Sequence, residues 1–122
     1  MTLIDTSAWI EQLRRGGVAT IRRQVETLLA TGDGAWCPLV RLELWNGARG
    51  KAERSVLKEM ETILPSLVMD AAVWDRAVAL AAGARAKGIT VPATDLLVAA
   101  CARHHGVALL HHDGHFDLIA EL

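Results

Sequence analysis

The chain has 122 residues, of which 52% are hydrophobic and 22% are charged, and its formal net charge is −1. This length and composition favour one globular domain, residues 1–122, and exclude a disordered chain or a strongly basic tail. The apolar runs are too short to span a bilayer, and the first residues lack the basic segment of a secretory signal. We therefore expect a cytoplasmic protein with no membrane contact.

Short apolar, β-prone runs alternate with segments in which apolar residues recur every three or four positions, the spacing of a helix. Thr6 or Ser7 is predicted to cap the first helix, and Gly32 to end the second. In chain order we expect a strand over 2–5, helices over 6–15 and 19–32, a strand over 34–37, helices over 38–47 and 51–64, a strand over 66–69, helices over 71–88 and 94–106, a strand over 107–112 and a last helical turn from 115. Strands connected by helices favour an α/β fold with a parallel sheet covered on both faces.

Four acidic residues are predicted to meet at one edge of that sheet. Asp5 and Asp113 follow the first and last strands, and Asp95 opens the helix that leads into the last strand. All three therefore lie near the carboxyl ends of the strands, where open α/β sheets bind ligands. Glu43, in the helix after the second strand, is expected to point across the same edge from a stripe that includes Leu39, Leu42 and Asn46.

A cluster of four acids requires compensation, because two unit charges about 4 Å apart repel by roughly 1 kcal/mol in bulk water and about 4 kcal/mol at an effective dielectric constant of 20. No basic partner is evident in the sequence. Oxygen-only ligand sets favour Mg²⁺ or Mn²⁺, and ions held in this way commonly bind phosphate oxygens. The pattern therefore predicts metal-dependent hydrolysis of phosphodiester bonds.

Each acid also has an ordinary structural interpretation. Asp5 can cap the first helix, and Asp95 can be a first-turn acid stabilised by the helix dipole. Glu43 can form a surface ion pair with Arg41, and Asp113 can be a turn residue. The metal site is favoured only because all four acids are expected to lie at the same edge of the sheet.

Four segments, in this order and spacing, resemble motifs of PIN domains, in particular the VapC toxins of type II toxin–antitoxin systems. They cover nearly the whole chain: "LIDTSAWI" (3–10), "LELWNGA" (42–48), "TDLLVAACARHHG" (94–106) and "LLHHDGHFDLIA" (109–120). The resemblance implies a three-layer α/β/α sandwich with a central parallel sheet of four to five strands. It also implies a Mg²⁺- or Mn²⁺-dependent endoribonuclease that forms a homodimer and is inhibited by a cognate antitoxin.

The resemblance assigns the catalytic and metal-binding roles to Asp5, Glu43, Asp95 and Asp113, with a smaller contribution from the hydroxyl of Thr6 or Ser7. The sequence departs from the family pattern at two positions. His111 stands where relatives often have Thr, and His115 stands where they often have a further acid. These departures leave the number of metals and the roles of the two histidines open.

The sequence leaves two alternative functions open. One is a zinc hydrolase that uses the five histidines, although neighbouring residues such as His111 and His112 point to opposite faces of a strand. The other is a catalytically silent PIN-like module that binds protein or RNA. The chain also has a group of basic residues that is predicted to form one side: Arg14, Arg15, Arg22, Arg23, Arg41, Arg49, Lys51 and Arg54.

Overall fold

A parallel sheet of three short strands lies at the centre of the molecule. In the computed structural model, which describes residues 1–122, the strands β1 (Thr2–Ile4), β2 (Gly34–Ala35) and β3 (Ala108–Leu110) run in the order β2-β1-β3. Leu3 of the central strand lies opposite Ala35 on one side and Leu109 on the other. The α/β class and the parallel sheet are therefore confirmed.

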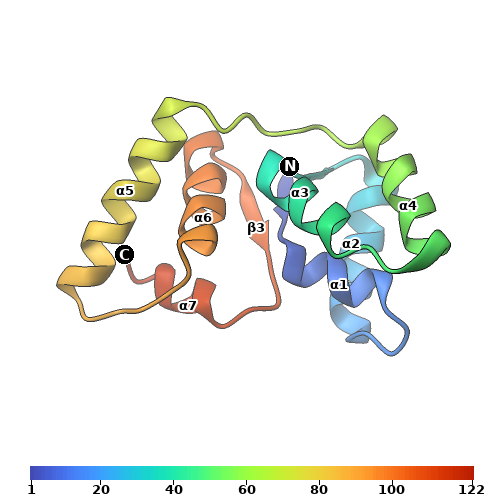
Figure 1. The fold of residues 1–122 in the computed structure, drawn as a ribbon, viewed down its shortest axis with the longest axis horizontal. Helices are drawn as coiled ribbons and strands as arrows, with labels where there is room; N and C mark the ends of the chain where they lie inside the picture. Colours follow the sequence, from blue (N-terminus) through green and yellow to red (C-terminus); the bar gives the residue numbers. More distant parts are fainter.

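Seven helices surround the sheet. They are α1 (Thr6–Leu13), α2 (Ala19–Thr31), α3 (Pro38–Asn46), α4 (Gly50–Ile63), α5 (Ala71–Ala86), α6 (Ala93–His105) and α7 (His115–Ile119). Figure 1 shows α1 to α4 on one side of β3 and α5 to α7 on the other. None of these helices combines the length and apolarity that crossing a bilayer requires.

The predicted strand over 66–69, and with it the sheet of four to five strands, is wrong. Only Ser66 pairs there, in a single parallel bridge to Trp36. Pro65 has no backbone N–H to donate to a ladder, and Val68 is 61% exposed, so the segment runs along the surface after one contact. The apolar residues of this segment are typical of a strand, but too few of their side chains face the core to stabilise a strand there.

The helix ends agree with the sequence in most places and differ at the first helix. Asp5, and not Thr6 or Ser7, caps α1, because its side chain accepts a hydrogen bond from the backbone N–H of Ser7. Gly106 ends α6 in the left-handed conformation, with φ of 64°, which glycine adopts without steric cost. The chain turns there and enters β3.

The hydrophobic core is one cluster of 22 buried residues that includes Leu3, Ile4 and Trp9. Helix α6 is buried from Leu96 to Ala102 and packs against α5. Full burial of one large aliphatic side chain contributes about 1.5–3 kcal/mol, so α6 is firmly held. Its first turn, which carries Asp95, therefore has a fixed position relative to the strand ends.

Candidate metal centre and active site

Asp5 is the most deeply buried acid of the site and directly follows the central strand. It is 4% exposed. Its Oδ2 accepts hydrogen bonds from the backbone N–H of Ser7 at 2.9 Å and from the Ser7 hydroxyl at 2.6 Å. The same hydroxyl accepts a bond from the backbone N–H of His112 at 2.9 Å, which ties Asp5 to the segment after β3. Asp5 is thus both a helix cap and a fixed carboxylate at the sheet edge.

Glu43 reaches the site from the second turn of α3. Its Oε1 accepts a hydrogen bond from the Thr6 hydroxyl at 2.8 Å. Burial raises the pKa of Glu43, the Thr6 hydroxyl lowers it, and the nearby charge of Asp5 raises it. The alternative ion pair with Arg41 does not form, because Arg41 binds Glu61.

The stripe predicted for Glu43 is partly wrong. Leu42 is 64% exposed and Asn46 is also exposed, whereas Val40 and Leu44 are buried. Glu43 is therefore half-buried at the border of the packed face of α3. A short helix between two loops offers too few positions for its pattern to fix its rotation.

Replacement of Thr6 by Val is expected to raise the pKa of Glu43 further, because it removes the hydrogen bond that stabilises the carboxylate. The volume is nearly unchanged, and the lost bond should reduce the free energy of unfolding by about 1 kcal/mol. Titration of Glu43 followed by NMR measures the pKa, with Thr94→Val, an exposed threonine, as the control. An unchanged pKa in Thr6→Val would contradict this role of Thr6.

Asp95 lies in the first turn of α6, with its side chain 16% exposed. Burial raises the pKa of Asp95, the charges of Asp113 and Asp5 raise it further, and His115 opposes the shift. The Asp95 carboxylate therefore lies within electrostatic reach of both other aspartates.

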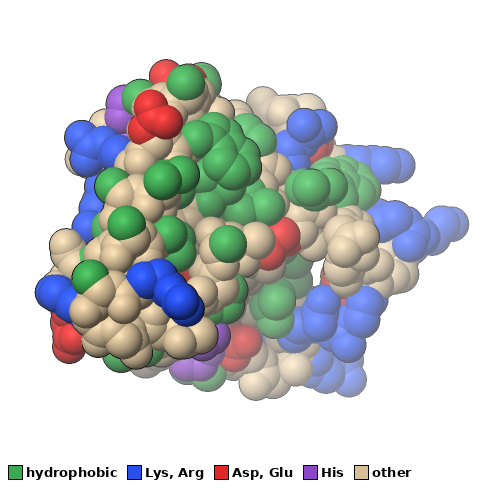
Figure 2. Space-filling view, turned by 60° about the vertical axis from the view of Figure 1, so that its left-hand side comes forward, with side chains coloured by type: hydrophobic (Ala, Val, Ile, Leu, Met, Phe, Trp, Pro, Cys, Tyr) green, Lys and Arg blue, Asp and Glu red, His purple; other side chains and the backbone are tan.

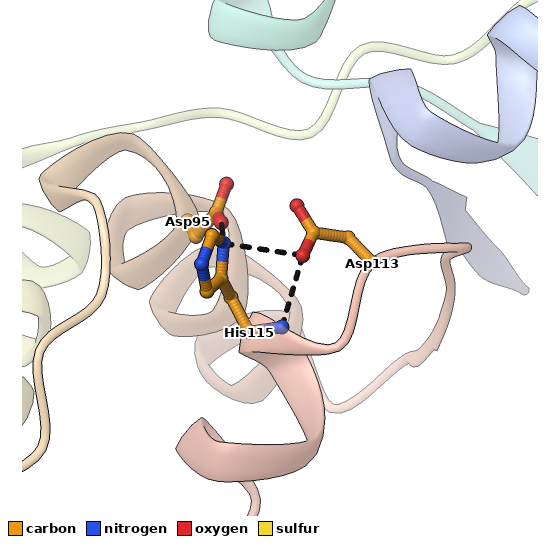
Figure 3. A group of neighbouring side chains, drawn as sticks. All are labelled: Asp95, Asp113 and His115. Atoms are coloured by element: carbon orange, nitrogen blue, oxygen red, sulfur yellow. Dashed lines mark hydrogen bonds and ion pairs between the residues drawn. The ribbon is translucent and has the colours of Figure 1, made fainter.

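Asp113 and His115 complete a cluster with Asp95, shown in Figure 3. The Nδ1 atom of His115 lies 3.1 Å from Asp95 Oδ2 and 3.1 Å from Asp113 Oδ1. The backbone N–H of His115 also donates to Asp113 Oδ1 at 2.9 Å. One donor atom from each of the three residues lies within 4.8 Å of the others.

The four predicted acids are linked through their charges. Asp5 acts on the pKa of both Glu43 and Asp95, and Asp113 acts on that of Asp95. None of the four pairs with a lysine or arginine. His115 is the only basic side chain that pairs with any of them. Asp95, Asp113 and His115 place donor atoms within 4.8 Å of one another, a set that fits a divalent cation, whereas Asp5 and Glu43 lie outside this group.

The other histidines do not join the acids. His104 and His105 stack edge to face at the end of α6, and His105 contacts the carbonyl of Val68. His111 packs on Phe116, with its Nδ1 facing the backbone N–H of Asp113 at 3.3 Å. Nothing here supports a zinc site built from several histidines. The sequence left the role of His115 open, and the structure places its ring against Asp95 and Asp113.

Together, the fold and the site define an α/β protein with an acidic site at the carboxyl edge of a parallel sheet. Residues 2–122 match the family model of the PIN domain. Ribonuclease VapC11 of Mycobacterium tuberculosis is 38% identical over 127 residues, covering 100% of this chain and 93% of the relative. Ribonuclease VapC51 of the same organism is 36% identical, covering 97% and 84%. The chain belongs to the PIN domain family, in its VapC branch.

Solved structures share the fold. VapBC2 from Rickettsia felis, bound to a DNA fragment from its promoter, matches with a TM-score of 0.80 and 20% identity over 99% of this chain and 94% of that chain. FitAcB from Neisseria gonorrhoeae matches with a TM-score of 0.75 and 19% identity, covering 100% and 94%. At these identities the likeness concerns the fold alone.

Proposed function

We propose that this protein is a metal-dependent endoribonuclease and the toxin component of a type II toxin–antitoxin system. The observation that carries the proposal is a set of four acids at the sheet edge of a VapC-like chain, in which Asp5 acts on Glu43 and Asp95, Asp113 acts on Asp95, and none pairs with Lys or Arg. The ribonuclease names of the relatives support RNA as the substrate.

In this proposal Asp5, Asp95 and Asp113 hold Mg²⁺ or Mn²⁺. When bound, the ion lowers the pKa of a water molecule and polarises the scissile phosphate. Glu43 accepts a proton from the attacking water, because burial moves its pKa upward, closer to neutral pH. Thr6 fixes the Glu43 carboxylate through its hydroxyl.

Ser7 is a positioning residue in this mechanism. Its hydroxyl joins Asp5 Oδ2 to the backbone N–H of His112, so it sets the distance between the first carboxylate and the segment that carries Asp113. This link would hold the Asp5 carboxylate beside the segment that carries Asp113, so that both could serve one ion. Pre-organised ligands of this kind avoid reorganisation during the reaction.

RNA and an antitoxin are the proposed partners. Most Lys and Arg side chains gather at one end of the view in Figure 2, which suits contact with phosphates. Arg14, Arg41 and Arg49 of the predicted basic side are occupied by acidic partners. The antitoxin is inferred from the VapBC and FitAB complexes that share the fold.

A homodimer is proposed through the exposed face of α5. Trp74 is 55% exposed and Val78 is 67% exposed, one helical turn apart, and Val68 lies exposed in the preceding segment. Figure 2 shows hydrophobic side chains on the forward face of the molecule. An exposed apolar patch is typical of interaction sites, and self-complementary patches produce two-fold dimers.

Trp74→Glu is therefore expected to convert the dimer into a monomer, because a charge replaces the largest apolar side chain of this patch. Light scattering coupled to gel filtration gives the mass directly. Asp75→Asn, a neighbouring exposed change, serves as the control. If Trp74→Glu still has the mass of a dimer, the dimer interface does not include this face of α5.

The enzymatic proposal is tested by incubating the purified protein with RNA and Mn²⁺ or Mg²⁺, with chelator in parallel. We expect cleavage that requires the metal and is lost in Asp113→Asn. Asp117→Asn is the matched control, because the Asp117 side chain is 80% exposed in the same helix region. Tight RNA binding without cleavage of any RNA tested would favour the catalytically silent module instead.

A further inference from the structure

One nitrogen donor lies among the oxygens of the proposed metal site. We propose that His115 Nδ1 binds the metal directly and makes the site prefer a first-row transition-metal dication, with Mn²⁺ as the representative, over Mg²⁺. This inference rests on the proposed metal-dependent function and adds to it the ligand that selects the ion.

The separations of the donor atoms suit one ion between them. His115 Nδ1 is 3.1 Å from a carboxylate oxygen of Asp95 and 3.1 Å from one of Asp113. Around a six-coordinate ion with bonds of about 2.1 Å, adjacent donors are about 3 Å apart and opposite donors about 4 Å apart. The two separations are compatible with adjacent positions. They are also those of the hydrogen bond and ion pairs that His115 makes with the two aspartates, so an ion would bind Nδ1 only after this nitrogen gives up its proton.

The position of the His115 imidazole ring is fixed by the backbone around it. His115 is the first residue of α7, and its N–H is bonded to Asp113 Oδ1. The next residue, Phe116, is 4% exposed and anchors α7 in the core. The His115 side chain itself is 45% exposed, so an ion can reach it from solvent.

The chemical consequence follows from ligand type. Mg²⁺ binds oxygen ligands and keeps much of its water, whereas imidazole binds the later divalent metals with increasing strength. A ring nitrogen among the carboxylate oxygens of this site therefore weakens the binding of Mg²⁺ relative to that of Mn²⁺. His111 does not share this role, because its Nδ1 faces the Asp113 backbone N–H.

The test compares His115→Asp, which makes every protein donor of the site an oxygen, with His115→Ala, which removes the ligand. Calorimetric titration with Mn²⁺ and with Mg²⁺ gives both dissociation constants for each protein. We expect the ratio of the Mg²⁺ to the Mn²⁺ dissociation constant to fall in both variants, because each loses the ring nitrogen that favours Mn²⁺. His112→Ala, an exposed histidine three residues away, should leave the ratio unchanged.

Pulsed electron paramagnetic resonance of the Mn²⁺-loaded protein supplies a second readout without any RNA. A ¹⁴N coupling to Mn²⁺ is expected in the unmodified protein and in His112→Ala, and its absence is expected in His115→Ala.

The outcomes separate this inference from the proposed function. One outcome overturns the inference: Mn²⁺ binding depends on Asp95 and Asp113 but shows no nitrogen coupling, and the preference for Mn²⁺ is unchanged in His115→Asp. This outcome would still support a metal centre built from the carboxylates. Failure of the unmodified protein to bind either metal contradicts both.

Discussion

Asp95→Asn is expected to abolish RNA cleavage while leaving the metal-free protein as stable as the original or more stable. The change removes one charged ligand, and loss of a single electrostatic group at a reacting centre commonly reduces the rate by about 10²–10³. It also removes like-charge repulsion with Asp113 and Asp5, which helps to raise the pKa of Asp95. Cleavage assays and urea unfolding in the presence of chelator measure the two effects.

The stability gain has a defined pH dependence. Because the pKa of Asp95 is raised in the folded state, folding favours its protonated form, and ionisation destabilises the fold as the pH rises from the ordinary aspartate pKa through the raised one. The difference between Asp95→Asn and the original protein should therefore appear above that interval and vanish below it. A clear loss of stability in Asp95→Asn at neutral pH would instead assign Asp95 to a structural role in the first turn of α6.

Mn²⁺ is expected to raise the melting temperature of the protein, because an ion that binds only the folded state stabilises it by mass action. At about 100 times the dissociation constant the gain is about 2.7 kcal/mol, which corresponds to a shift on the order of 10 °C for a domain of this size. Thermal unfolding with and without the ion measures the shift, and excess chelator should reverse it.

The specificity of that shift is checked with two matched variants. Asp5→Asn should lose most of it, because Asp5 is a buried carboxylate at the sheet edge. Asp117→Asn, with an exposed side chain, should keep it. If Mn²⁺ raises the melting temperature of both variants equally, the ion binds at another part of the surface.

Much of the fold could be predicted from the sequence because its signals are local. The run before Asp5 and the run after Gly106 are apolar and β-prone, and they form the paired strands β1 and β3. The helices were recognisable because their apolar residues repeat at helical spacing and end at residues such as Gly32.

The errors arose where a local pattern depends on distant partners. Residues 66–69 are as apolar as a strand, yet pairing requires a neighbour with free backbone groups along its length, and only Trp36 provides a bridge. The role of His115 was left open for a similar reason, because its orientation is set by where α7 begins relative to Asp113 and by the burial of Phe116. The residues next to His115 in the sequence do not determine, by themselves, where α7 begins or how deeply Phe116 is buried. The catalytic roles of the four acids remain predictions.

The chemical ends of the cleaved RNA test the central claim most directly. Attack by a metal-activated water leaves a phosphate monoester on one new end and a free hydroxyl on the other. A metal-free reaction through the ribose 2′-hydroxyl leaves a 2′,3′-cyclic phosphate instead. Mass spectrometry of the fragments is expected to show monoester and hydroxyl ends, formed only with Mn²⁺ or Mg²⁺ and absent in Asp95→Asn. Cyclic phosphate ends, or cleavage that persists in chelator, would contradict the proposed metal centre.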